Sequence, residues 1–505
     1  MIDTDRKFGF FRSFLWPIYG RELKKVLPML ATLFLICFNY TVLRNLKDSL
    51  VVTTSGAEVI PFIKVWVMLP AAILLTWIYA KLCNRFSQEK VFYIVISGFL
   101  TSYLLFAFLL YPYQHLLHPE ASAETLRQLL PAGCKGLINM YRNWTFTLFY
   151  VMSELWSSMV LTVLFWGFAN QVTSVKESQR YYSVFSVWMN FATIAAGMCA
   201  IYCSTITLPF LKISDAWGQT ITSLILLVTA SGLASMVLFR WMNKNVFDNA
   251  FSCKKHTKEK KKLSLRQSVS YVSNSPYLLS IAILVVSYNL VINLVEVVWK
   301  DQLRLLYPGS GEYNIYMNWL TSATALISTL TALFMPKIIS RLGWTPTALI
   351  TPLITLFTSL AFFSFILFQD FLGPAVIALT GSTPLALAVL FGSSQNCFCK
   401  AAKYSVFDAT KEMAYIPLSE ECKRKGKAAI DGIGSRLGKS GGSLIHQSLI
   451  MTFGSIAISA PYVAAILLLV IVLWIVSVNT LGYKFNSLVA EQEGATAEEP
   501  LLNVV

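Results

Sequence analysis

Charged residues are scarce in this chain. They make up 13% of its 505 residues, while hydrophobic residues make up 55%; a soluble domain carries about 25% charged residues. Apolar runs long enough to cross a hydrocarbon core, roughly 20 residues each, recur from one end of the sequence to the other. The composition therefore excludes an ordinary soluble domain and predicts a protein that crosses a membrane many times.

Residues that bind metals or form disulfides are also few. The chain has 4 histidines and 9 cysteines. The odd number of cysteines gives no evident disulfide framework, and Cys397 and Cys399 are spaced too closely for a usual pair of zinc ligands. We therefore expect neither a metal nor a cofactor.

Two further signals are missing. The segment GSRLGKSGG resembles a phosphate-binding P-loop, but that motif needs a glycine at the position of Ile433, and no predicted strand precedes it. We therefore expect no ATP hydrolysis and no enzymatic activity. Residues 1–25 lack the apolar core and small-residue cleavage site of a signal peptide, so we expect them to remain as a cytoplasmic amino terminus.

Acidic residues are outnumbered by basic ones, 26 against 41. The basic residues lie mainly in short segments between apolar runs, so we do not expect a nucleic-acid partner. Alternate connections are basic, as at Lys81 and Arg85 and again at Lys337 and Arg341. The positive-inside rule places these connections, and with them both termini, in the cytoplasm.

Twelve apolar segments are candidate spans, six on each side of a basic segment. They are Val26 to Leu43, Val65 to Tyr79, Val91 to Tyr111, Phe146 to Phe168, Val184 to Thr205, Thr220 to Phe239, Leu278 to Trp299, Trp319 to Met335, Ala348 to Phe368, Phe371 to Phe391, Ala429 to Phe453 and Val463 to Val478. We accordingly divide the chain into an amino terminus (1–25), a first half (26–240), a basic cytoplasmic linker (241–276), a second half (277–480) and a cytoplasmic tail (481–505).

The two halves resemble each other. The first carries RNLKDSL with Lys47, and the second carries VVWKDQL with Lys300. AKLCNRF with Lys81 and PKIISRL with Lys337 correspond at nearly the same offset, about 255 residues. Two parallel repeats of six helices are the architecture of major-facilitator-type transporters, whose cargo site lies between the halves near the membrane midplane. We expect an all-α membrane protein of this fold.

Several charged residues fall inside predicted spans, where each costs at least ~2.5 kcal/mol unless it has a partner or a function. Tyr40, Arg44 and Lys47 share one helical face, because they are spaced by four and three residues. Glu154 lies inside the fourth span. Glu296 precedes Lys300 by one helical turn, which allows an intrahelical ion pair.

The eleventh span adds Arg436 and Lys439, with Ser443 on the same face. One interpretation is that all these charges are structural ion pairs that hold helices together. The other is that the cations line a central cavity for a polyanion, because lysine supplies a point charge to phosphate and arginine a bidentate fork. The number of cations in both halves favours the cavity.

Long segments of the chain resemble the nucleotide translocases of obligate intracellular bacteria and plastids. They are RNLKDSLVVT, SELWSSMVLTVLFWGFANQVT, INLVEVVWKDQL, KYSVFDATKEMAYIPL and GKAAIDGIGSRLGKSGGSLIHQ. The resemblance implies exchange of ATP for ADP with phosphate, without hydrolysis. It also implies functional roles for Lys47, Glu154, Glu296 and Lys439.

The sequence departs from many ATP/ADP exchangers of that family at two motifs. Those exchangers have R-D-T-K-D where this chain has Arg44 to Asp48, and W-G where it has Trp156 and Ser157. The departures leave the phosphate-binding cations in place and leave the base specificity open. Members from plastids carry a long transit peptide, so the short amino terminus here favours a bacterial inner membrane.

Three functions remain open from the sequence. The first is an antiporter that exchanges ATP and ADP by alternating access, as a monomer in the lipid bilayer. In this function the nucleotide or its phosphates are bound by Tyr40, Arg44, Lys47, Arg436, Lys439 and Ser443. The movement is coupled to the cargo by Glu154, Glu296 and Lys300. The second is a proton-coupled importer of nucleoside triphosphates, or an exchanger of other nucleotides. The third is a membrane scaffold or receptor that transports nothing.

Overall fold

The chain folds into long helices in the computed structural model, which describes residues 16–206, 215–246, 272–418, 426–427 and 429–502. Within these residues every regular element is a helix. The predicted linker lies mostly outside the described residues, as do residues 1–15. The all-α prediction is confirmed.

The first half begins with α2 (Leu23–Ser55) after a short turn, η1 (Gly20–Glu22). Three of its later spans contain π-helical segments. Its remaining elements are α3 (Val59–Phe62), η2 (Ile63–Val67), α4 (Met68–Arg85), α5 (Gln88–Leu105), η3 (Phe106–Leu110), α6 (Gln114–Leu117), α7 (Glu120–Leu129), η4 (Ala132–Cys134), α8 (Lys135–Arg142), α9 (Trp144–Trp156), η5 (Ser157–Phe165), α10 (Trp166–Val172), α11 (Val175–Thr205) and α12 (Ala216–Asn245).

The second half follows the same order of long helices. Its elements are α14 (Pro276–Leu306), α15 (Ser310–Leu342), α16 (Trp344–Leu367), α17 (Gln369–Thr380), α18 (Pro384–Ala402), η7 (Lys403–Phe407), α19 (Asp408–Ala414), η8 (Ile430–Gly434), α21 (Ser435–Phe453) and α22 (Ile456–Leu502). The last helix continues through much of the predicted tail.

Nine helices of the described residues are long and apolar enough to cross a membrane, and a bent pair, α17 with α18 to α19, makes a tenth. Helices α15 and α21 are two further long helices packed within the bundle. The order of the twelve long segments follows the sequence prediction.

The predicted tenth span, Phe371 to Phe391, is wrong in position. The structure divides it at a bend of 87° between α17 and the helical segment Pro384–Ala414. The local sequence explains the break: Gly381 ends α17 with a φ of 67°, a conformation that glycine adopts without strain. Thr383 then caps the next helix through its side chain, with Pro384 in the first turn. The span itself therefore begins near Pro384 and continues well beyond Phe391.

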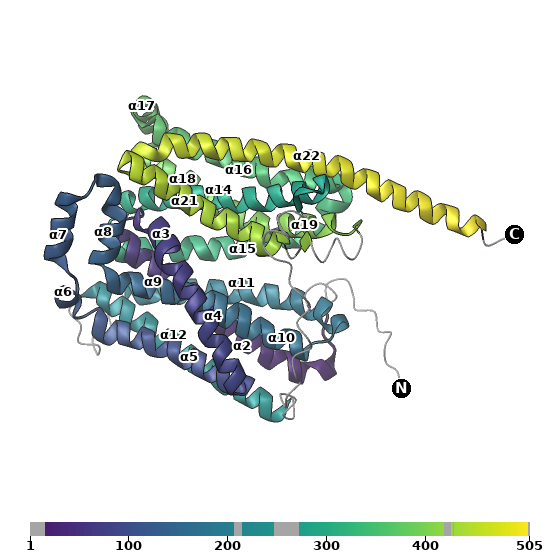
Figure 1. The fold of residues 1–505 in the computed structure, drawn as a ribbon, viewed down its shortest axis with the longest axis horizontal. Coiled ribbons are helices and arrows are strands. Elements are labelled where there is room, and N and C mark those ends of the chain that lie inside the picture. Colours follow the sequence, from purple (N-terminus) through teal and green to yellow (C-terminus); the bar gives the residue numbers. More distant parts are fainter. Residues whose placement is uncertain (1–15, 207–214, 247–271, 419–425, 428, 503–505) are drawn as a thin grey trace.

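The two halves lie side by side, with the first half below and the second above in Figure 1. Helix α15 joins them, because it packs against both α11 and α2. One end of the bundle carries the start of α2 and the end of α22, and we call it the terminal end. The opposite end carries α6, α7, α8 and α17 (Figure 1), and we call it the capped end.

Between the middle of the bundle and the capped end, polar side chains join the halves. Asn45 donates to Asn318 at 2.8 Å, and one turn further along α2 Ser49 donates to Asn314 at 3.1 Å. Closer still to the capped end, η4 approaches α21 so tightly that a Cβ on Gly133 would lie 2.3 Å from the carbonyl oxygen of Met451. The halves are therefore held together on this side.

Candidate functional site

The centre of the site is a pair of lysines that share one aspartate. Asp48 of α2 accepts from Lys47 of the same helix and from Lys300 of α14, each at 2.9 Å. All three residues are nearly inaccessible, with exposed fractions of 3% for Lys47 and 2% for each of the others. Charges buried to this extent need partners, and Asp48 is the partner of one lysine from each half.

Each lysine has a second carboxylate in its own half. Lys47 lies 3.2 Å from Glu154 of α9, and Lys300 lies 3.2 Å from Glu296, the intrahelical pair that the spacing allowed. Glu296 also lies 3.7 Å from Lys64 of η2, so the first half contacts it as well. Lys64 additionally donates to Asn293 of α14 at 2.9 Å.

These six residues form a continuous chain of charges that we call the ion ladder: Glu154, Lys47, Asp48, Lys300, Glu296 and Lys64. The ladder crosses from one half to the other twice, at Asp48 to Lys300 and at Glu296 to Lys64. It contains three formal positive and three formal negative charges. Its positive and negative charges can therefore neutralise one another while no cargo is bound.

Two further cations lie beside the ladder. Arg44 of α2 and Lys400 of α18 are half-buried and interact electrostatically with Glu296 and with each other. In the described part of the chain neither makes an ion pair or a side-chain hydrogen bond. The ladder together with these two residues carries a formal surplus of two positive charges.

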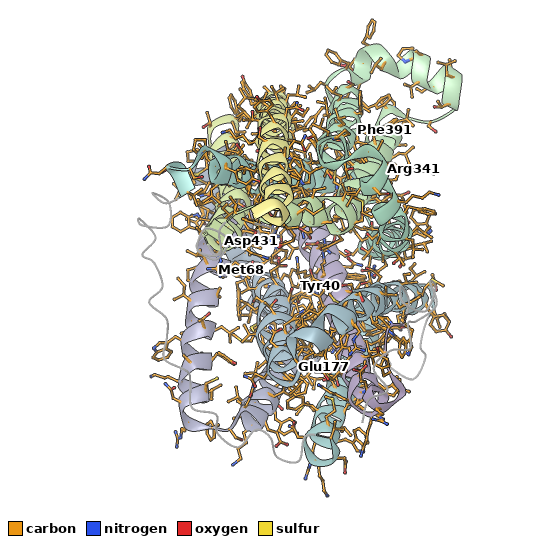
Figure 2. All side chains as sticks on the ribbon, turned by 90° about the vertical axis from the view of Figure 1, so that its right-hand side faces the viewer. Tyr40, Met68, Glu177, Arg341, Phe391 and Asp431 are labelled. Carbon is orange, nitrogen blue, oxygen red and sulfur yellow. The ribbon has the colours of Figure 1, made fainter. Side chains whose placement is uncertain are left out.

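Tyrosines accompany the cations. Lys47 stacks over the ring of Tyr150 at 3.8 Å from its centroid. Tyr40 lies one turn before Arg44 on α2, within electrostatic range of it. Figure 2 looks onto the terminal end and shows Tyr40 at the boundary between the two halves.

The predicted residues of the eleventh span lie apart from the ladder. Arg436 and Lys439 are exposed on α21, and neither forms an ion pair with another described residue. Ser443 is buried and donates to the backbone oxygen of Lys439 at 3.3 Å. Glycines let α21 lie close to α14, since a Cβ on Gly438 would lie 2.7 Å from that of Asn289.

Sequence reasoning missed Lys64 and Lys400 as members of this cluster. Lys64 is a single charge within an apolar stretch, IPFIKVWVML, and that isolation was the available signal. Lys400 lies beyond Phe391, the predicted end of the tenth span, because that span was placed too early. Asp48 was noted in the repeated Lys-Asp pair, but its position between two lysines of different halves is visible only in the structure.

π-helical segments lie at or near three residues of this cluster. Lys64 lies within η2, η5 follows Glu154 by three residues, and η7 begins three residues after Lys400. Such segments insert an extra residue into a helical turn and are frequent at functional sites. They alter the direction of side chains locally without ending the span.

Comparison with known proteins identifies the family of the chain. A family model described as TLC ATP/ADP transporter matches residues 1–485. The chain belongs to this family. ADP,ATP carrier protein 1 of Chlamydia muridarum (strain MoPn / Nigg) is 45% identical over 502 residues, which cover 98% of this chain and 95% of the relative. The chloroplastic ADP,ATP carrier protein 1 of Arabidopsis thaliana is 44% identical, over 94% of this chain and 77% of the relative.

Solved structures resemble this chain in fold. A bacterial homologue of the iron transporter ferroportin in the inward-facing state has a TM-score of 0.53 at 15% identity, covering 92% of this chain and 100% of that one. A D-xylose-proton symporter has a TM-score of 0.52 at 11% identity, covering 91% and 97%. These likenesses confirm the expected major-facilitator-like fold and, at such low identity, nothing about the cargo.

Proposed function

We propose that this protein exchanges ATP for ADP, the latter with phosphate, across a bacterial inner membrane by alternating access. One observation carries the proposal: a buried network of ion pairs joins the two halves and has a surplus of positive charge beside it. The names of the chlamydial and plastid relatives, ADP,ATP carrier proteins, agree with it. No step of this exchange requires hydrolysis of the cargo.

The surplus charge gives a physical reason for exchange. With no cargo, Arg44 and Lys400 repel each other, and occluding them in a medium of low dielectric raises that repulsion. The phosphates of a nucleotide neutralise the surplus, so the halves can close around the loaded site at lower cost. Cargo is then needed for the movement in each direction, because a ligand shifts a conformational equilibrium only through its differential affinity for the two states.

The ion ladder supplies the coupling in this proposal. Glu296 contacts Lys64 of the other half, and Asp48 contacts Lys300 of the other half. Opening the capped end would separate both pairs. We place Arg44 and Lys47 beside the phosphates on the first half, with Arg436 and Lys439 as further cations of the second half along the cargo's path.

A proton-coupled importer of nucleoside triphosphates is the alternative. The observation that favours it is the exposure of Glu154, whose side chain is 41% accessible although it pairs with Lys47. A carboxylate that solvent reaches within a membrane protein can take up a proton. Uptake by this mechanism would depend on a pH gradient and would need no internal nucleotide.

We further propose that both termini are cytoplasmic and that the protein acts as a monomer. Lys81 and Arg85 lie near the end of α4, and Arg341 lies near the end of α15. Both helices end toward the terminal end (Figure 1), which the positive-inside rule assigns to the cytoplasm. The basis for a monomer is that both sides of the ladder come from one chain.

The proposal is tested by uptake of labelled ATP into proteoliposomes without a pH gradient. Vesicles loaded with ADP should accumulate ATP, whereas empty vesicles should not. A panel of unlabelled nucleotides and NAD, added outside, then reports which base and how many phosphates the site accepts. Equal uptake into loaded and empty vesicles contradicts exchange, and a requirement for an imposed proton gradient supports the importer. Absence of uptake for every nucleotide would favour the scaffold or receptor.

A further inference from the structure

Two cations of the central cluster stand out because they form no ion pair with another described residue. Lys47, Lys64 and Lys300 each have a carboxylate within the ion ladder. Arg44 and Lys400 have no such partner among the described residues, although both are half-buried. Placing two like charges near each other, neither with a carboxylate in direct contact, is unfavourable, so their position indicates a binding site for an anion.

The two helices that carry these cations run in opposite directions. Helix α2 starts at the terminal end, whereas the segment from α18 to α19 runs toward it (Figure 1). Tyr40 precedes Arg44 by four residues, and Tyr404 follows Lys400 by four residues. Four residues are about one helical turn, or roughly 6 Å. Each cation therefore has a tyrosine one turn nearer the terminal end, one from each half.

The tyrosines lie near each other and near Arg44. Tyr404 is within electrostatic range of both Tyr40 and Arg44. It lies in η7, where the π-helical turn changes the direction of the side chains, and it is 64% exposed. Tyr40 lies at the boundary of the halves (Figure 2). The Lys403 ammonium lies 4.3 Å from the centroid of the Tyr404 ring, and the remaining exposed surface of that ring is open to a ligand.

We infer that Arg44 and Lys400 make the first contacts with the phosphates of the cargo, and that Tyr40 and Tyr404 flank its nucleoside. The ligand is a nucleoside diphosphate or triphosphate that enters from the terminal end with its phosphates foremost. The inference rests on the proposed function and assigns two residues, Lys400 and Tyr404, for which the sequence predicted no role.

The chemistry of the four side chains fits this ligand. The guanidinium of Arg44 presents a fork that matches two phosphate oxygens, and Lys400 adds a compact point charge from the other half. Aromatic rings stack on the face of any base, so the tyrosines hold the nucleoside without specifying it. Because each pair takes one residue from each half, a bound nucleotide bridges the halves on the terminal side.

The ion ladder lies farther from the terminal end than Arg44 does. Lys47 follows Arg44 by three residues toward the capped end, and it is held by Asp48 and Glu154. It becomes available to a phosphate only after it leaves one of these carboxylates. Binding at Arg44 and Lys400 therefore precedes any exchange of partners within the ladder.

The test measures binding of labelled ADP to the purified full-length protein, with two partial ligands as competitors. Pyrophosphate supplies the phosphates without a base, and adenosine supplies the base without phosphates. R44Q and K400Q should each weaken ADP and pyrophosphate at least about tenfold, which is the effect of losing a charge-assisted hydrogen bond. Neither substitution should alter competition by adenosine. Y404A should weaken ADP and adenosine and leave pyrophosphate unchanged.

Matched controls come from the same half of the chain. K337Q removes one exposed lysine of α15, and Y483A removes one exposed tyrosine of α22; both lie outside the cluster. Both should bind ADP as the wild type does. Should K400Q fail to fold, Y404A still decides the question, because the exposed Tyr404 side chain can be removed without opening a cavity.

The outcomes separate the two proposals. No ADP binding by the wild type overturns the proposed function itself. If the wild type binds ADP, either of two results overturns only this inference. One is wild-type ADP affinity in K400Q. The other is that pyrophosphate and adenosine compete for Y404A as they do for the wild type.

Discussion

Replacing Asp48 by asparagine probes the one carboxylate that both central lysines share. The substitution keeps the shape of the side chain and removes its charge, so Lys47 and Lys300 each lose an ion pair of 2.9 Å. Breaking a buried ion pair from one side destabilises a protein by about 3–5 kcal/mol. We expect about 3 kcal/mol, the lower limit, because the lysines keep Glu154 and Glu296 as second partners.

The assay is reversible unfolding of the purified protein in mixed micelles. The matched control is D301N, the same substitution at the repeat-related position, where the aspartate forms no ion pair with a described residue. We expect it to change the unfolding free energy by about 1 kcal/mol or less. A double-mutant cycle with K300M should give a coupling energy of about 1–3 kcal/mol with Asp48. Equal effects of D48N and D301N, or no coupling with Lys300, would refute the ladder as a link between the halves.

The remaining predictions concern coupling, the eleventh span and the capped end. E296Q should slow exchange far more than it weakens ADP binding, because Glu296 joins the halves; equal losses in transport and binding assays contradict this. K439A should weaken nucleotide binding markedly, and K439R should restore it only in part, since the fork of arginine differs from the point charge of lysine. Wild-type affinity in K439A would show that Lys439 does not belong to the binding site. G133A should destabilise the protein by about 1–3 kcal/mol in thermal unfolding, because its Cβ would overlap the backbone of Met451. It should also favour an opened capped end, which is measured by the accessibility of cysteines there. The control G98A has open space around its Cβ and should change neither measurement.

The order of the helices could be predicted from the sequence because lipid requires long apolar segments, and the repeated Lys-Asp pairs indicated two related halves. The tenth span was misplaced for a physical reason. Residues 371–391 are apolar throughout, so hydropathy alone does not show where the chain turns. The helix-ending Gly381 and the capping Thr383 carry that information, and they mark the bend of 87°.

The candidate site was predictable in part. The cost of burying charge indicated Lys47, Glu154, Glu296 and Lys300, all of which belong to the ladder. Their roles toward the cargo stay predictions. Contacts between residues about 250 positions apart, such as Asp48 with Lys300, depend on how the halves pack and have no local signature. The same holds for the approach of Lys400 to the first half.

The central claim, that cargo is needed for movement in each direction, is tested most directly by efflux of labelled ADP from proteoliposomes. The vesicles contain the purified protein and have no pH gradient, and external nucleotide is either absent or supplied as ATP. We expect rapid efflux only with external ATP, because the empty site retains its unneutralised cations and resists closure. Efflux into nucleotide-free buffer at the rate seen with ATP would contradict exchange and favour proton-coupled uptake.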